Sequence, residues 1–198
     1  MKKFLVILAA LSLMTGVAVA ENEIGIYLAP TVTPEDAEAL ACYSGAAGQF
    51  TAYCIITDPY NNNLGTPVNF VGGFEFRMEY PAGLFVTPTL DPTATNFMSA
   101  PDFFCGANVP VIDGQCVLIT LTIGTFTTDP ASWYLTPVSD EPAQSIPGAM
   151  AMTDAEDNFS ISQAFPASGS FTDPVFGMWT CPVPNEDVNW GSVKSLFR

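Results

Sequence analysis

The chain has 198 residues, with 20 acidic and 5 basic side chains, no His, and a net charge of −15. Because so acidic a surface repels nucleic acid and anionic lipid, we predict neither as a partner. Charged residues make up only 13% of the chain, which favours sheets joined by polar turns over helices with many ion pairs. The absence of His removes the commonest general base and metal ligand, which argues against an enzyme.

Residues 1–20 have the pattern of a secretory signal peptide. Lys2 and Lys3 precede an apolar stretch, and a small-residue cleavage site ends at Ala20. We therefore expect a secreted protein, in the extracellular space, at the cell surface or in the periplasm. No later stretch is long and apolar enough for a membrane span, so no integral membrane segment is expected after cleavage.

One helix is predicted early in the chain, over residues 33–40 (TPEDAEAL). Thr33 is a suitable cap, and Pro34 suits the first helical position. Strand patterns dominate the rest, at residues 25–28, 49–58, 74–80, 116–126, 132–138, 149–154 and 158–165. Turn residues separate them at intervals of about ten residues, which predicts an all-β domain at 21–178, an antiparallel sandwich or jelly roll. The nearly continuous apolar run at 116–126 predicts a central strand with neighbours on both sides.

The segments GQFTAYCIITDP and VGGFEFRMEYPAGLF resemble the opening of cohesin domains and related carbohydrate-binding-type sandwiches. The resemblance extends over about residues 48–126, and the residues that carry it are Gly48, Phe50, Gly73, Phe74, Phe76 and Leu84. It implies a cohesin-like β-sandwich that binds a protein or glycan partner through a sheet face. No catalytic motif, cofactor site or metal site is predicted, since the acidic turns at 58–63 and 154–158 lack the spacing of a calcium loop.

The alternating segment 74–80 places Glu75, Arg77 and Glu79 on one strand face, opposite its apolar residues. We expect a solvated face on which Arg77 neutralises local charge. Tyr53 and Tyr134 are out of phase with their apolar neighbours, and together these five residues form the predicted binding face. A glycoside hydrolase of the concanavalin-like type is a third hypothesis, but Glu75 and Glu79 would lie ~13 Å apart on a regular strand.

Five cysteines in an exported chain predict disulfides with one thiol left over. Cys105 and Cys116 flank an Asp113-Gly114 turn, so a hairpin disulfide is predicted between them. Cys42 and Cys54 are the next most local pair, and Cys54 is also a candidate buried thiol. Cys181 is then left unpaired.

Residues 179–198 are predicted to form a linker and an amphipathic C-terminal helix. Its apolar face comprises Trp190, Val193, Leu196 and Phe197. Two roles remain open for it: docking on its own domain, or attachment and sorting.

The leading hypothesis is a secreted, non-catalytic binding or adhesion module. The alternative is a structural subunit of a surface layer or extracellular filament, in which the spare Cys181 would support self-association.

Overall fold

A computed structural model describes residues 21–181 of the chain. The predicted signal peptide, residues 1–20, and residues 182–198 lie outside the described residues. The predicted helix face of Trp190, Val193, Leu196 and Phe197 falls in the second of these segments. Within 21–181, no helix is long and apolar enough to cross a membrane.

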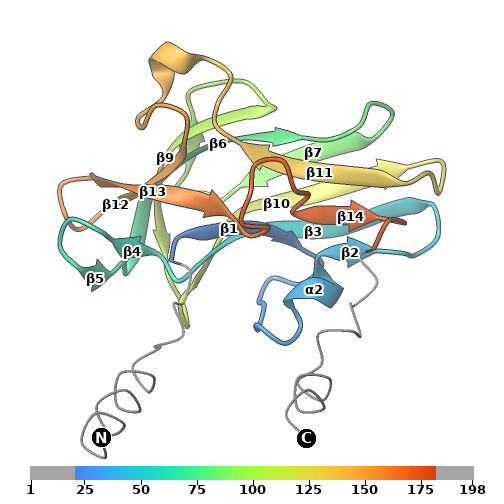
Figure 1. Cartoon of the computed structure of the whole chain (residues 1–198), viewed down its shortest axis with the longest axis horizontal. Helices are drawn as coiled ribbons and strands as arrows, with labels where there is room; N and C mark the ends of the chain where they lie inside the picture. The colour runs from blue at the N-terminus through green and yellow to red at the C-terminus, as the bar shows by residue number, and fades with distance from the viewer. Residues whose placement is uncertain (1–20, 182–198) are drawn as a thin grey trace, which may run out of the picture.

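Strands dominate the described part of the chain, which forms one twelve-stranded sheet and one two-stranded sheet (Figure 1). In chain order the strands are β1 (Glu23–Tyr27), β2 (Cys42–Tyr43), β3 (Gly48–Thr57), β4 (Tyr60–Asn61), β5 (Thr66–Pro67), β6 (Phe70–Glu79), β7 (Phe85–Leu90), β8 (Thr95–Asn96), β9 (Asp102–Pro110), β10 (Gln115–Thr125), β11 (Ala131–Thr136), β12 (Met150–Asp154), β13 (Ser160–Pro166) and β14 (Phe176–Met178). The helical elements are α2 (Ala37–Leu40) and the 3-10 turn η1 (Glu141–Ala143). The predicted all-β class is therefore confirmed at the level of a mostly β chain.

The large sheet follows the order β2-β14-β11-β6-β12-β13-β1-β3-β10-β7, with β9 paired to β6 and β8 paired to β9. Pairing is antiparallel except between β1 and β13 and between β14 and β2. β10 lies between β3 and β7, which confirms the central strand predicted at 116–126.

The sheet branches at β6. β9 pairs along one edge of β6, and the other edge is shared by β12 at Val71–Glu75 and β11 at Arg77–Glu79. Because β11 and β12 occupy the same edge, the chain between them, residues 137–149, has to leave the sheet before it returns. This connection lies against the outer face of β6 and β9, where the side chains of Glu75 and Asp102 bind it.

Apolar side chains of β3 and β10 pack with those of β6, β9 and β11 in one core. Phe74, Phe76 and Met78 are all buried there, as the period-two pattern of residues 74–80 predicts. Trp133 and Phe176 are among the largest fully buried side chains, and their rings meet edge to face at 6.0 Å. The sheet therefore bends around a single hydrophobic core.

The predicted helix at 33–40 is shorter than expected. Thr33 accepts a hydrogen bond from the backbone N–H of Asp36, but helical geometry begins only at Ala37. The segment covers β3 through a small cluster of Tyr27, Val32 and Ile55.

The predicted disulfides are wrong. Cys42 pairs with Cys181, with 5.3 Å between their Cα atoms, and Cys54, Cys105 and Cys116 are buried free thiols. The physical reason is topological: β2, which carries Cys42, pairs with β14, and Cys181 lies just beyond β14. Cys181 is consequently not available as the spare cysteine of an inter-chain bond.

The hairpin expected around Asp113-Gly114 is only half correct. Both residues adopt positive φ, at 50° and 75°, so the tight turn forms. The strands on either side then separate, because β9 pairs with β6 whereas β10 pairs with β3 and β7. Cys105 and Cys116 therefore do not meet as neighbours across a hairpin.

Residues 179–181, predicted as the start of a linker, contact the sheet. Trp179 donates from its indole nitrogen to the backbone oxygen of Gly45 at 2.9 Å, and Thr180 bonds to the backbone of Ala131. The disulfide attaches Cys181 beside β2. The described chain is thus held to the sheet up to its last residue.

Candidate functional site

The five residues of the predicted binding face do not form one surface. Tyr53 is half-buried on β3, where it packs against the cluster under residues 28–41. Tyr134 lies opposite Glu79 across the β6–β11 pair, which β12, β13 and β1 separate from β3 in the strand order. Arg77 and Glu79 are on the same strand as Glu75, but their environments differ from that of Glu75.

Glu75 is buried, not solvated as its position in the alternating strand predicts. Only 3% of its surface is exposed, and both carboxylate oxygens accept from the backbone N–H of Ser145, at 3.0 and 3.1 Å. The cause is the connection at 137–149, which covers this part of the strand. Strand periodicity could not indicate this cover, because the covering segment lies 70 residues away in the chain.

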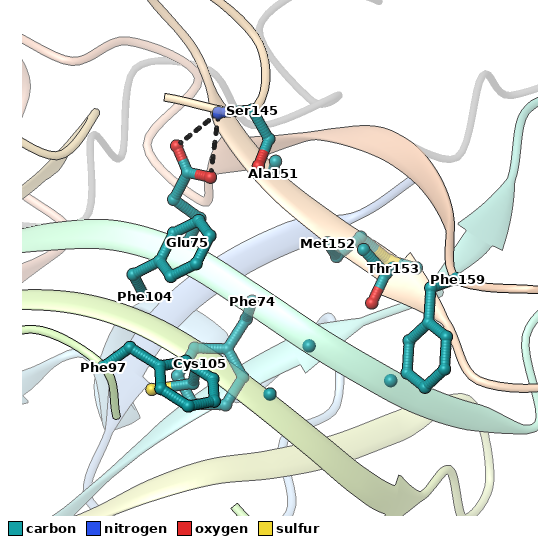
Figure 2. A pocket seen from close by; sticks show the side chains of 13 residues that line it. Phe74, Glu75, Phe97, Phe104, Cys105, Ser145, Ala151, Met152, Thr153 and Phe159 are labelled. Atoms are coloured by element: carbon teal, nitrogen blue, oxygen red, sulfur yellow. Dashed lines mark hydrogen bonds between the residues drawn. The ribbon is translucent and has the colours of Figure 1, made fainter. Parts of the chain in front are cut away.

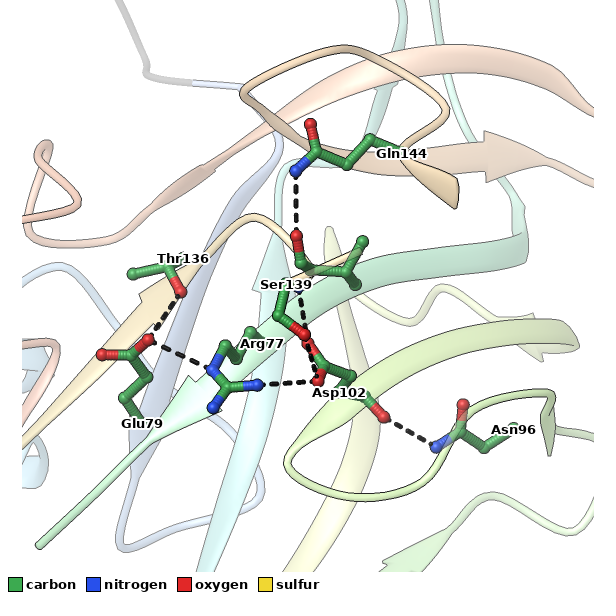
Figure 3. A network of polar contacts seen from close by, with 8 residues as sticks. Arg77, Glu79, Asn96, Asp102, Thr136, Ser139 and Gln144 are labelled. Carbon is green, nitrogen blue, oxygen red and sulfur yellow. Dashed lines mark hydrogen bonds and ion pairs between the residues drawn. The ribbon is translucent and has the colours of Figure 1, made fainter. Parts of the chain in front are cut away.

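Arg77 connects two strands and the connection above them (Figure 3). Its guanidinium donates to Asp102 at 2.7 Å and to Glu79 at 3.2 Å. Asp102 in turn accepts from the backbone N–H of Ser139 at 2.8 Å and from the Ser139 hydroxyl at 2.9 Å. Arg77 therefore also joins β6 to β9, and its partner Asp102 holds the connection on the sheet.

Among the hollows lined by residues 21–181, a groove on the outer face of β6, β9 and β12 combines the most aromatic side chains with a carboxylate, and it is the candidate site (Figure 2). It encloses about 200 Å³. Phe97 and Phe104 line one side, and Phe159 lines the other. Phe97 and Phe159 are 69% and 56% exposed, so two large apolar side chains are exposed at the same groove. None of the three aromatic residues was predicted as a site residue.

Glycines form the floor of the groove. A Cβ atom on Gly73 would lie 2.6 Å from the backbone oxygen of Cys105 and 3.1 Å from the Thr153 hydroxyl. Phe159 lies over Gly72, and Phe97 lies over Gly106, with ring atoms 2.9 and 3.3 Å from where a Cβ would be. Glycine at these strand positions thus allows neighbouring backbone and the rings of Phe97 and Phe159 to approach the sheet closely. Glycines inside a strand are a sequence signal of such close approach.

Two polar groups lie among the aromatic walls. One is the carboxylate of Glu75, which lines the groove and accepts a hydrogen bond from the backbone N–H of Ser145 (Figure 2). The other is the hydroxyl of Thr153, which is buried and has no hydrogen-bond partner among the described residues. A buried polar atom without a partner is uncommon, and it is accounted for where a ligand or water completes the bond.

The turn that carries Phe159 is held rigidly. Asn158 and Phe159 both have positive φ, at 48° and 58°, which is rare for a bulky aromatic residue. The buried side chain of Asn61 donates to Asp154 at 2.9 Å and to Asp157 at 3.1 Å, and so attaches the turn to the β4–β5 hairpin. The Asn61 amide occupies the space between these acids that a cation would otherwise need.

The titratable groups that line the groove include one thiol, Cys105. No group of three or more His, Cys, Asp or Glu in residues 21–181 is arranged to hold a metal ion. Burial raises the pKa of Cys105, which borders the groove, to about 12, so its thiol is protonated at neutral pH.

A second hollow lies between residues 32–37 and the ends of β3 and β10. It is lined by the acids Glu23, Asp58 and Asp113. Burial, reinforced by the nearby charge of Asp58, raises the pKa of Glu23. The side chain of Gln115 bonds to the backbone of Val32 and thereby joins the two sides. With three carboxylates and Tyr27 as its one aromatic residue, its lining is more polar than that of the groove.

The chain was compared with protein-family models, curated proteins and solved structures. No protein-family model, curated protein or solved structure matches the chain.

Proposed function

We propose that the protein is a secreted, non-catalytic binding module that holds a carbohydrate in the groove of β6, β9 and β12. One observation carries the proposal: the exposed rings of Phe97 and Phe159 stand on opposite sides of a glycine floor, with the Glu75 carboxylate beside them. Ligand sites combine apolar walls with a few directed polar groups in this way.

A sugar ring matches the two kinds of surface in the groove. The C–H groups on the faces of a pyranose ring pack on aromatic rings, and its hydroxyls donate to acceptors such as carboxylates. Phe97 and Phe159 supply the apolar contact, while Glu75 supplies a polar partner. A rigid ring also loses little conformational entropy when it is bound.

The fold and location belong to the same proposal. We infer a β-sandwich of cohesin-like type. It is supported by the hydrophobic core that the side chains of β3 and β10 share with those of β6, β9 and β11. Secretion is supported by the pattern of residues 1–20 and by the Cys42–Cys181 disulfide, a bond that persists in oxidising compartments.

The absence of catalysis is supported by the acidic residues themselves. Glu75 is the one carboxylate that lines the groove within residues 21–181. Glu79, its expected partner in a glycoside hydrolase, is 49% exposed and binds Arg77. The pair of facing carboxylates that glycoside hydrolysis requires is therefore not assembled around this groove.

Binding measurements on ring-truncated variants test the proposal. A glycan array identifies the ligand, and titration calorimetry then compares wild type with Phe97→Ala and Phe159→Ala. Each substitution should weaken binding about tenfold, since losing one aromatic contact removes about 1.4 kcal/mol. Phe165→Ala is the control, because Phe165 is 42% exposed on β13 but does not line the groove. Equal loss in all three variants, or no glycan bound by wild type, would refute the proposal.

A surface-layer or filament subunit remains the second candidate, on one observation. Phe85 and Phe126 are 63% and 85% exposed and meet edge to face at 5.5 Å beside the edge strand β7. Such a pair could join two copies of the chain. Sedimentation of the calorimetry samples separates the candidates: concentration-dependent assembly lost in Phe126→Ser would favour the subunit, and a monomer throughout would exclude it.

A further inference from the structure

Glu75 is a buried carboxylate with unusually few donors. Both of its oxygens share the single N–H of Ser145, and no other hydrogen bond to its side chain occurs within residues 21–181. A carboxylate has about four acceptor positions, so most of its capacity is unused. Burying such a charge without a partner is unfavourable. The unused capacity favours a ligand that brings donors, and a positive charge most of all.

Within residues 21–181, no basic side chain binds Glu75. Arg77 is the one basic residue in the described sequence, and its guanidinium is bound by Asp102 and Glu79. The chain as a whole carries a charge of −15, which attracts cations to its surface. A positive group in the groove would therefore meet an uncompensated partner.

The aromatic walls suit the same kind of group. Phe97 and Phe104 lie edge to face with 6.4 Å between their ring centroids, and Phe159 faces them from the other side. Rings around a site attract an ammonium group through their electron-rich faces. The carboxylate and the rings thus favour the same charge.

A sugar fits the groove better than a peptide does. The groove lies on the face of the sheet, over strands that already pair with one another: β6 with β9 and β6 with β12. Extended peptides bind at sheet edges, where backbone groups are free, and those groups are used here. A ring that packs on side chains and bonds to Glu75 does not need them.

We propose, on the basis of the carbohydrate-binding function proposed above, that the ligand is an amino sugar whose protonated amine binds the carboxylate of Glu75 between the aromatic walls. The sugar ring then packs on Phe97 and Phe159.

The test compares two oligosaccharides that differ only at nitrogen. Titration calorimetry at about pH 5.5, where an amine is protonated, measures binding of a glucosamine hexamer and of the N-acetylglucosamine hexamer. We expect the glucosamine hexamer to bind at least about tenfold more tightly. Glu75→Gln should abolish this preference, while it retains an oxygen that can accept from Ser145.

Glu79→Gln is the matched control for long-range charge. It removes the same charge from the same strand, but the Glu79 carboxylate is 49% exposed and does not line the groove. We expect its affinity for the glucosamine hexamer to stay within about twofold of wild type. Equal weakening by the two substitutions, or equally tight binding of a tetralysine peptide, would overturn the proposal in favour of general attraction between opposite charges.

A pH series on wild type keeps the test independent of how well Glu75→Gln folds. Between about pH 5.5 and pH 8.5 the sugar amine loses its proton, so affinity for the glucosamine hexamer should fall while that for the N-acetylated hexamer stays constant. Tight, pH-independent binding of both hexamers would refute the amino-sugar assignment and leave the carbohydrate function standing. Failure of wild type to bind any glycan would refute both.

Discussion

Gly73 lies inside β6 at a position where the neighbouring strands approach closely. A Cβ there would meet the backbone of Cys105 and the hydroxyl of Thr153. Gly124, near the end of β10, is also a strand residue, but a Cβ there would be 3.6 Å from the nearest atom, an ordinary contact distance. The position of Gly73 therefore requires a residue without a Cβ, whereas the position of Gly124 has room for one.

Substituting each with Ala should give effects of opposite sign. Gly73→Ala should lower the free energy of unfolding by about 1–3 kcal/mol, because the new methyl group forces the backbone of β9 or β6 to move. Gly124→Ala should raise it by about 0.5 kcal/mol, because Ala loses less backbone entropy on folding. Urea unfolding followed by fluorescence measures both. Similar stability of the two variants would mean that the floor of the groove is not closely packed.

Single residues also show how far sequence patterns extend. Alternation along residues 74–80 correctly predicted that Phe74, Phe76 and Met78 are buried. The same alternation wrongly predicted a solvated Glu75, because what covers a strand face depends on a connection distant in the chain. Phe97 and Phe159 lie in or beside turns, where no periodicity distinguishes a binding side chain from an ordinary one.

At the scale of elements, strand existence was more predictable than strand partnership. The long strands β3, β6 and β10 and the turn at Asp113-Gly114 follow from local patterns. β9 was not predicted, and its pairing with β6 instead of β10 separates Cys105 from Cys116. Local spacing therefore pairs the wrong cysteines: the observed bond joins residues 139 positions apart, brought together by the parallel pairing of β2 and β14.

Thiol labelling checks this arrangement of the cysteines. Burial raises the pKa of Cys105 and Cys116 to about 12, and burial likewise raises the pKa of Cys54. Because a raised pKa leaves little thiolate below pH 9, the native protein should resist iodoacetamide at about pH 8. After denaturation without reductant, mass spectrometry should find label on these three residues alone. Label on Cys42 or Cys181 would contradict the disulfide.

The disulfide should also contribute strongly to stability. It closes a loop of 139 residues, for which loop-closure entropy predicts a contribution of roughly 5 kcal/mol. A reductant should therefore lower the melting temperature of wild type and leave that of the Cys42→Ser, Cys181→Ser double variant unchanged.

At the scale of the whole molecule, the strands of the large sheet share one main hydrophobic core. Two places on the surface carry exposed aromatic side chains. The outer face of β6, β9 and β12 carries the groove, and the region beside the edge strand β7 carries Phe85 and Phe126. Composition and alternation are enough to predict a mostly β chain. They do not predict the branching at β6, which sends residues 137–149 over the face and buries Glu75.

The central claim is that the groove is the ligand site. Chemical-shift mapping by NMR tests it most directly, with an isotope-labelled protein titrated with the glucosamine hexamer. The largest shifts should fall on the amides of Gly72, Gly73, Gly106 and Ser145, which line the groove. Shifts concentrated instead on Gly48, Gly124 and Phe126, beside the edge strand β7, would contradict the claim.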